Sequence, residues 1–102
     1  MRSLMIVDDE KNIRYGLKTM IEREFPDQYE IRLAAQGQEA LDSFREEPAA
    51  IVITDIRMPV MDGIRLIEAL AELEGTLEMK PVVLILSGYD DFEYAKAAIR
   101  YQ

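Results

Sequence analysis

The stretch "IVITDIRMPVMDG", residues 51–63, decides the fold. Residues 51–54 favour β-structure and run directly into the carboxylate of Asp55, after which come an Arg, a Met-Pro pair and an Asp-Gly turn. Such an apolar strand is buried, and an ionised group at its end is unfavourable unless a partner stabilises it. The rest of the sequence must therefore supply a partner for Asp55.

Working outward from this stretch, apolar segments alternate with amphipathic ones. Strands are expected at residues 4–7, 30–35, 51–54 and 82–87, and a helical pattern follows each of them. The apolar stripes of the four expected helices are Ile13, Leu17, Met20 and Ile21; Ala40, Leu41 and Phe44; Ile64, Ile67, Leu70 and Ala71; and Phe92, Ala95 and Ile99.

This alternation predicts the fold class. Strands and helices in turn, with short connections, are typical of an α/β fold with a doubly wound parallel sheet and helices on both faces. Residues 30–35 partly alternate between apolar and polar, which suits the edge of the sheet. Residues 82–86 are apolar on both faces, which suits an interior strand. The 102 residues are enough for one small domain and too few for two.

The composition excludes several function classes. The chain has no Cys and no His, which removes disulfides, thiol chemistry, the usual zinc sites, Ser-His triads and a phosphohistidine of its own. Its net charge of −8 disfavours direct binding to nucleic acid. No apolar run approaches membrane-spanning length, so we expect a cytoplasmic protein without a membrane segment.

Polar side chains follow three of the expected strands. Asp8 and Asp9 come after the first, Asp55 and Arg57 after the third, and Ser87 after the fourth. Carboxyl ends of neighbouring parallel strands meet at one edge of a sheet, so these groups converge if the three strands are neighbours. Three carboxylates cannot all ionise comfortably in a small space, and Mg²⁺ prefers such oxygen ligands. The acids therefore predict a Mg²⁺ site.

Each of these residues also has a simpler interpretation. Asp9 alone is more often the cap of the following helix, Ser87 a turn residue and Arg57 a surface charge. Met58 and Met61 are expected to pack rather than to take part in chemistry. The joint arrangement of carboxylates and a hydroxyl at three strand ends is what favours a functional site.

Three motifs carry a resemblance. "IVDDE" after the first strand, "ITDIRMPVMDG" after the third and "LILSGYDDFEYAKAAI" after the fourth resemble the receiver domain of two-component response regulators. The similarity covers essentially the whole chain, in order and at the right spacings. The last segment is similar to receivers that precede AraC-type DNA-binding output domains. The resemblance implies the strand order 2-1-3-4-5.

The resemblance also implies a role for each site residue. Asp55 matches the phospho-accepting aspartate. Asp9 matches the acid that binds Mg²⁺ directly, and Asp8 the neighbour that helps through water. Arg57 matches the position whose backbone carbonyl completes the metal site. Ser87 matches the hydroxyl that hydrogen-bonds the phosphoryl group and shifts when it is present.

Partners follow from the same resemblance. The phosphoryl donor would be a phosphohistidine of a sensor histidine kinase, and small acyl phosphates can substitute in many receivers. The parent protein would carry a C-terminal DNA-binding output domain. The expected protein is a phospho-acceptor that assists its own phosphorylation and dephosphorylation, not a conventional turnover enzyme.

The family continues with a fifth strand that ends in a Lys and with a fifth helix. This chain ends before them, so we expect residues 1–102 to be a single receiver domain that is incomplete at its C-terminus. The strand at residues 82–86 would then be an apolar edge, which invites pairing with another chain. We expect self-association through the region that begins at Val82 and ends at Tyr101.

Two other functions remain open at this point. One is an interaction-only receiver that is not phosphorylated because the family's Lys is absent. The other is a phosphatase of the haloacid dehalogenase type, whose signature has a second Asp two residues after the nucleophile as acid/base. Arg57 occupies that position here and cannot act in that way.

Overall fold

Four strands and four helices alternate in a computed structural model that describes residues 2–56, 58, 61–73, 80–86 and 91–100. The strands are β1 (Arg2–Val7), β2 (Tyr29–Ala34), β3 (Ile51–Asp55) and β4 (Val82–Leu86). The helices are α1 (Lys11–Glu24), α2 (Gly37–Glu46), α3 (Gly63–Glu72) and α4 (Asp91–Arg100). Within these ranges no helix is long and apolar enough to cross a membrane.

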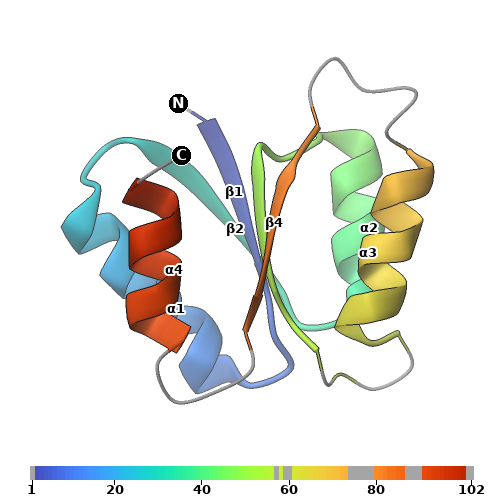
Figure 1. Cartoon of the computed structure of the whole chain (residues 1–102), viewed down its shortest axis with the longest axis horizontal. Helices are drawn as coiled ribbons and strands as arrows, with labels where there is room; N and C mark the ends of the chain where they lie inside the picture. Colours follow the sequence, from blue (N-terminus) through green and yellow to red (C-terminus); the bar gives the residue numbers. More distant parts are fainter. Residues whose placement is uncertain (1, 57, 59–60, 74–79, 87–90, 101–102) are drawn as a thin grey trace.

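The strands form one parallel sheet in the order β2-β1-β3-β4. This confirms the predicted doubly wound α/β fold, and β2 lies at an edge as its alternation predicted. Val7 is paired with Thr54, and Asp55 with Leu86, so β1, β3 and β4 end close to one level. In Figure 1 these ends lie at the bottom of the sheet.

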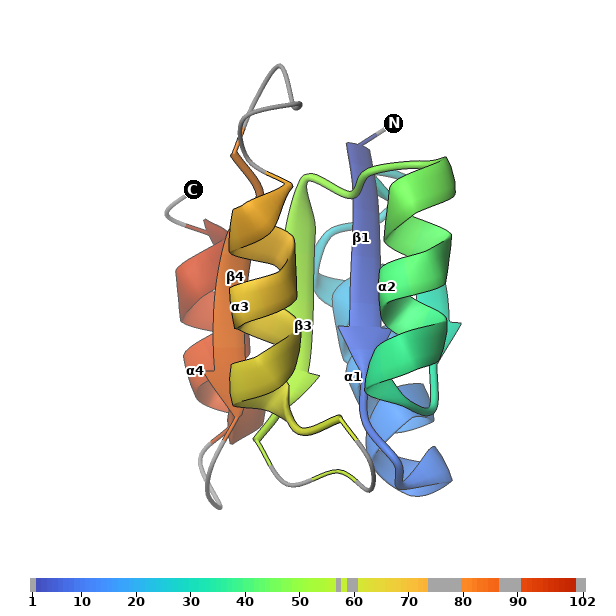
Figure 2. The same cartoon turned by 90° about the vertical axis from the view of Figure 1, so that its right-hand side faces the viewer.

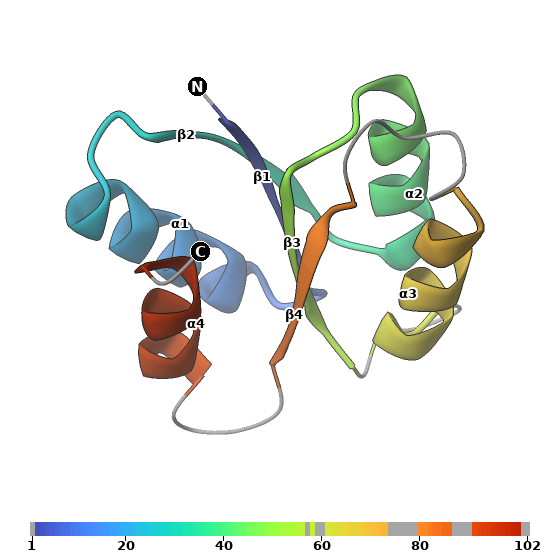
Figure 3. The same ribbon diagram turned by 45° about the horizontal axis from the view of Figure 1, so that its top comes forward.

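The helices cover the two faces of the sheet in pairs. α1 and α4 lie on one face, and α2 and α3 lie on the other (Figures 1 and 3). Each face has its own core because successive strand side chains point to opposite sides. Thus Leu4 and Ile6 of β1 pack with α1 and α4, whereas Met5 and Val7 pack with α2 and α3.

The predicted inner stripe of α3 is partly wrong. Leu66 and Leu70 are buried, whereas Ile64 is 46% exposed and Ala71 is also exposed. Leu66 and Leu70 are one helical turn apart, so they share a face, and α3 turns that face to the sheet. Ile64 and Ala71 are left on a flank of the helix.

Candidate functional site

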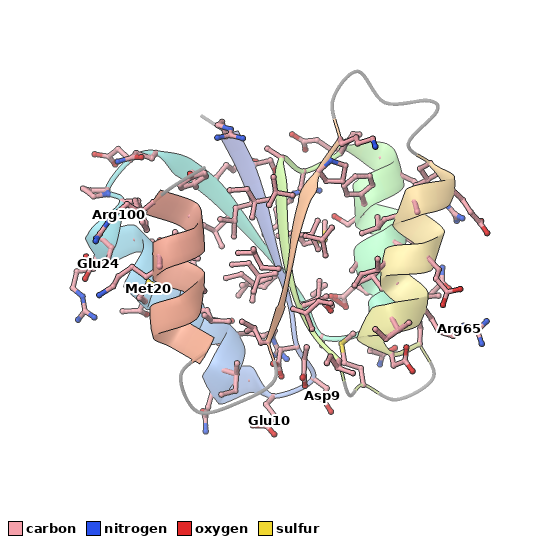
Figure 4. The ribbon with its side chains drawn as sticks, in the orientation of Figure 1. Asp9, Glu10, Met20, Glu24, Arg65 and Arg100 are labelled. Carbon is pink, nitrogen blue, oxygen red and sulfur yellow. The ribbon has the colours of Figure 1, made fainter. Side chains whose placement is uncertain are left out.

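The sheet brings three predicted acids together at the carboxyl ends of β1 and β3. Asp8 directly follows β1, Asp55 is the last residue of β3, and these two strands are neighbours. Each of Asp8, Asp9 and Asp55 offers a carboxylate oxygen, and these oxygens all lie within 4.8 Å of one another. Figure 4 shows Asp9, beside Glu10, at this lower end of the sheet. The predicted convergence of the three carboxylates is confirmed.

Asp8 is fixed by the backbone around it. Its side chain is buried, and its Oδ1 accepts a hydrogen bond of 2.8 Å from the N–H of Glu10. Its own N–H donates to the carbonyl of Ala34 in β2 at 3.1 Å, and its carbonyl accepts from the Arg14 guanidinium at 2.9 Å. The carboxylate therefore has a set position beside the other two acids.

Burial raises the pKa of Asp8 to about 6. The hydrogen bond from the N–H of Glu10 lowers this pKa, and the charges of Asp55, Asp9 and Glu10 raise it. Near neutral pH the ionised carboxylate thus lies in unfavourable surroundings, which a bound cation would relieve. Three clustered carboxylates suit a hard divalent ion such as Mg²⁺.

Asp9 does not cap the helix that follows it. The N-cap position of α1 is Glu10, and among the described residues no side chain makes a capping hydrogen bond there. Asp9 is instead exposed, with its carboxylate in the acidic cluster. The simpler interpretation of Asp9 as a helix cap is therefore wrong.

The backbone of Asp55 is held by its neighbours. The buried Thr54 donates its hydroxyl to the carbonyl of Asp55 at 3.0 Å. Gly63 comes so close that a Cβ added to it would lie 2.2 Å from that same carbonyl oxygen. The N–H of Gly63 also donates to the carbonyl of Ile56 at 2.8 Å, which closes the loop between β3 and α3. Sequence reasoning had identified only an Asp-Gly turn here.

The two methionines of this loop pack, as predicted. Met58 is buried in the core of α2 and α3, and Met61 is half-buried against that core. The backbone of Met61 approaches Gly37, where an added Cβ would lie 2.7 Å from the carbonyl oxygen of Met61. The roles predicted for Arg57 and Ser87 fall outside the described residues and stay predictions.

The Asp62 side chain caps the N-terminus of α3, and removing it gives a first testable prediction. Its carboxylate accepts a hydrogen bond from the N–H of Arg65 at 2.9 Å, a capping contact that sequence reasoning missed. Asp62→Ala should lower the free energy of unfolding by about 1 kcal/mol in urea denaturation.

The matched control is Asp42→Ala, which removes an exposed carboxylate from the surface of α2. Its two contacts, with Gln38 and Arg45, are both made at the exposed surface of the helix. The control should therefore change stability by less than about 0.5 kcal/mol. Equal losses in the two variants would contradict the capping role.

Comparison with known proteins gives a consistent result. The profile of the response regulator receiver domain matches residues 4–102. The chain is 43% identical over 101 residues to an uncharacterized response regulatory protein of Staphylococcus epidermidis. It is 42% identical over 101 residues to the transcriptional regulatory protein HptR of Staphylococcus aureus. Both alignments cover 99% of this chain but only 38% of the relative, so the chain spans well under half of their length.

Solved structures show the same similarity. A two component transcriptional regulator AraC from Clostridium phytofermentans is 36% identical, with a TM-score of 0.72, over 100% of this chain and 76% of that one. The REC domain of the response regulator AraT from Geobacillus stearothermophilus is 32% identical, with a TM-score of 0.67. That alignment covers 99% of this chain and 75% of the other.

Proposed function

Because the chain belongs to the response regulator receiver domain family, we propose that Asp55 accepts a phosphoryl group from a phosphohistidine of a sensor kinase. Receiver domains are signalling domains rather than conventional enzymes. The observation that carries the proposal is the cluster of Asp8, Asp9 and Asp55 at the carboxyl end of the sheet. A carboxylate beside two further acids suits a nucleophile that works together with a divalent cation.

The transfer requires little of the protein beyond positioning. A carboxylate oxygen of Asp55 attacks the phosphorus, the bond from phosphorus to the donor imidazole breaks, and an acyl phosphate forms. The donor histidine belongs to another protein, since this chain has no His. Asp55 is half-buried, and its backbone is held by Thr54 and Gly63, so its carboxylate is presented from a rigid strand end.

The carboxylates of Asp8, Asp9 and Asp55 would hold a Mg²⁺ ion, and the backbone carbonyl of Arg57 is proposed as a further ligand. When bound, Mg²⁺ supplies the positive charge that offsets the repulsion between these acids and an anionic phosphoryl group. Ser87 is proposed to donate its hydroxyl to the phosphoryl group. The assignments of Arg57 and Ser87 rest on the family resemblance.

Incubation with Mg²⁺ and a small acyl phosphate tests the acceptor role. We expect the wild-type protein to gain the mass of one phosphoryl group in intact-protein mass spectrometry and Asp55→Asn to gain none. Asp42→Asn is the matched control, because it removes an exposed carboxylate of α2 that is not part of the acidic cluster, and it should still react. Beryllofluoride, a stable mimic of the phosphoryl group, should likewise bind to the wild type and not to Asp55→Asn.

If the 102-residue chain does not react, a chimera distinguishes two explanations: Asp55 is not an acceptor, or the reaction requires residues that follow this chain. It continues the chain with the residues that follow the matched region in the Staphylococcus aureus relative. If only the chimera reacts, the acceptor assignment holds and residues that follow the matched region are required. If neither protein reacts, the assignment of Asp55 is wrong and an interaction-only receiver becomes the better proposal.

The wider assignment follows from the relatives. We propose that residues 1–102 are the receiver part of a longer cytoplasmic transcriptional regulator with a DNA-binding output domain. The Staphylococcus aureus relative is named a transcriptional regulatory protein, and the structure from Clostridium phytofermentans is named a two component transcriptional regulator AraC. Self-association through residues 82–101 stays a prediction.

A further inference from the structure

Strand β2 forms one edge of the sheet, because it pairs with β1 alone. Figure 2 shows β4, β3 and β1 in this order from left to right, so the edge at β2 lies beyond β1, on the side away from β4. The N–H of Asp8 donates to the carbonyl of Ala34 at 3.1 Å, so the peptide groups of Ala34 point toward β1. Because peptide groups alternate along a strand, those of Tyr29, Ile31 and Leu33 point outward, away from the sheet.

The side chains of the same three residues form an apolar border on the face of α1. Tyr29, Ile31 and Leu33 are half-buried and pack against the core that α1 covers. Beside them lies a hollow of about 210 Å³. Its lining includes the apolar residues Ile21, Phe25, Tyr29 and Ile31 and two exposed acids, Glu22 and Asp27. An apolar side chain placed just beyond the edge of β2 on this face would be partly buried there.

The other face of β2 carries two opposite charges. Glu30 is exposed, and none of the described residues forms an ion pair with it. The guanidinium of Arg32 is fixed by three neighbours. It donates from Nε to the hydroxyl of Ser3 at 3.2 Å, from Nη1 to the hydroxyl of Ser43 at 2.8 Å and from Nη2 to the carbonyl of Glu47 at 2.6 Å. A negative and a positive charge thus flank Ile31 at equal distance along the strand.

Charged residues on an edge strand usually prevent it from pairing with another chain. On β2 their effect depends on the register of the pairing. When two copies of β2 pair antiparallel with Ile31 at the centre, Glu30 of each copy lies opposite Arg32 of the other, which is favourable. A centre at Glu30 or at Arg32 would set like charges opposite each other, and larger shifts pair fewer residues. The charges of β2 therefore favour one register.

The backbone and the hollow suit the same register. Antiparallel pairing centred on Ile31 sets Ile31 opposite Ile31 and Tyr29 opposite Leu33, and all of these residues have outward peptide groups that can pair. Leu33 of each copy then lies beside Tyr29 of the other, at the edge of its hollow. The arrangement has two-fold symmetry, so both copies use the same surface and the assembly closes at two.

We propose that two copies of this chain pair antiparallel through the outer edges of β2, centred on Ile31, and so form one continuous sheet. A second copy is the partner because the charges on this edge are complementary to themselves. The strands of the two copies run in opposite directions, so the two acidic clusters lie at opposite ends of the joined sheet. The proposal goes beyond phosphoryl transfer and does not depend on it. Each copy contributes little more than one strand edge, so the dimer is weak and reversible.

Amide hydrogen exchange of the wild-type protein tests the pairing directly. The N–H groups of Ile31 and Leu33 should exchange at least about fivefold more slowly at about 1 mM protein than at about 20 μM. The matched control lies at the opposite edge of the sheet. The N–H of Val82 donates to the carbonyl of Ala50 at 2.9 Å, so the N–H of Val83 points outward from β4. Its exchange rate should change by less than about twofold.

Disulfide cross-linking identifies the residues at the two-fold axis, since the chain has no native Cys. Folded Ile31→Cys should form a linked dimer on mild oxidation, because the Cα atoms of a hydrogen-bonded antiparallel pair are about 5.5 Å apart. Leu33→Cys is the matched control on the same face of β2. It lies opposite Tyr29 rather than itself and should link at least about fivefold less. An equimolar mixture of Tyr29→Cys and Leu33→Cys should link again.

Reversal of one charge tests the register. Glu30→Lys places a positive charge opposite Arg32 at two points of the dimer and should weaken dimerisation by about tenfold in sedimentation equilibrium. Glu68→Lys is the matched control, because it makes the same change of charge at an exposed residue of α3. It should weaken dimerisation by less than about twofold.

Several results would overturn the proposal. Exchange at Ile31 that does not depend on protein concentration would show that β2 stays unpaired, whether or not the Cys variants fold. Protection of Val83 without protection of Ile31 would assign self-association to the edge at β4. Equal cross-linking of Ile31→Cys and Leu33→Cys would indicate random collisions instead of a fixed register. Equal weakening by Glu30→Lys and Glu68→Lys would show that net charge governs the association.

Discussion

Raising the pH from about 4 to 7 without Mg²⁺ should destabilise the wild-type protein relative to Asp8→Asn by on the order of 3 kcal/mol. The pKa of Asp8 is about 6 in the folded protein, against 3.8 for an unperturbed aspartate. Between these values the folded state binds more protons than the unfolded state, so stability falls as the pH rises. The favourable contribution of Asp8 is complete below the unfolded pKa and is lost as the pH passes through the folded pKa.

Urea denaturation of wild type and Asp8→Asn at a series of pH values measures this effect. The difference between the two unfolding free energies should change between about pH 4 and pH 7 and stay constant at higher pH. Asp42→Asn, which removes an exposed carboxylate outside the acidic cluster, is the matched control. An equal change in the Asp42→Asn series would show that the pH dependence does not arise at Asp8.

Mg²⁺ should offset the loss of folding stability that the ionisation of Asp8 causes. A cation that binds only the folded state stabilises it, and protons compete with the cation for the carboxylates. Stabilisation of the wild type by a fixed Mg²⁺ concentration should therefore be larger at pH 7 than at pH 5. Stabilisation that is equal at the two pH values would contradict binding at the acidic cluster.

The fold and the acidic cluster were predictable because both depend on rules that act over short stretches. Alternation of strands and helices with short connections allows few arrangements other than a doubly wound parallel sheet. The sequence places Asp8 and Asp55 at the ends of two strands. In such a sheet, the ends of neighbouring strands lie together, so the two carboxylates could be predicted to meet. The sheet order β2-β1-β3-β4 then brought them together as predicted.

What could not be predicted depends on contacts between distant parts of the chain. The apolar pattern of α3 permits two adjoining faces, and only the packing against the sheet selects Leu66 rather than Ile64. The sequence "DD" does not show that Asp8 is buried and Asp9 exposed. The face chosen by α4 has no signal in its own sequence, because an amphipathic helix can cover either side of β4.

Gly63→Ala should lower the free energy of unfolding by about 2–3 kcal/mol. A Cβ at this position would lie 2.2 Å from the carbonyl oxygen of Asp55 and 3.0 Å from the Cα of Ile56. These atoms are backbone, so no side-chain rotation relieves the clash, and the start of α3 must move away from the end of β3. The hydrogen bond from the N–H of Gly63 to the carbonyl of Ile56 would be strained by the same movement.

The displacement should also reach the acidic cluster, because Gly63 contacts the backbone of Asp55 itself. Isothermal titration should show Mg²⁺ affinity reduced by about tenfold in Gly63→Ala, since a metal site tolerates little misplacement of its ligands. Ala71→Gly is the matched control, because it weakens the exposed side of α3 by about 1 kcal/mol without touching Asp55. If Ala71→Gly lowers the affinity as much as Gly63→Ala, the loss reflects a weaker helix. A loss confined to Gly63→Ala means that the close approach of α3 to β3 positions the Asp55 carboxylate.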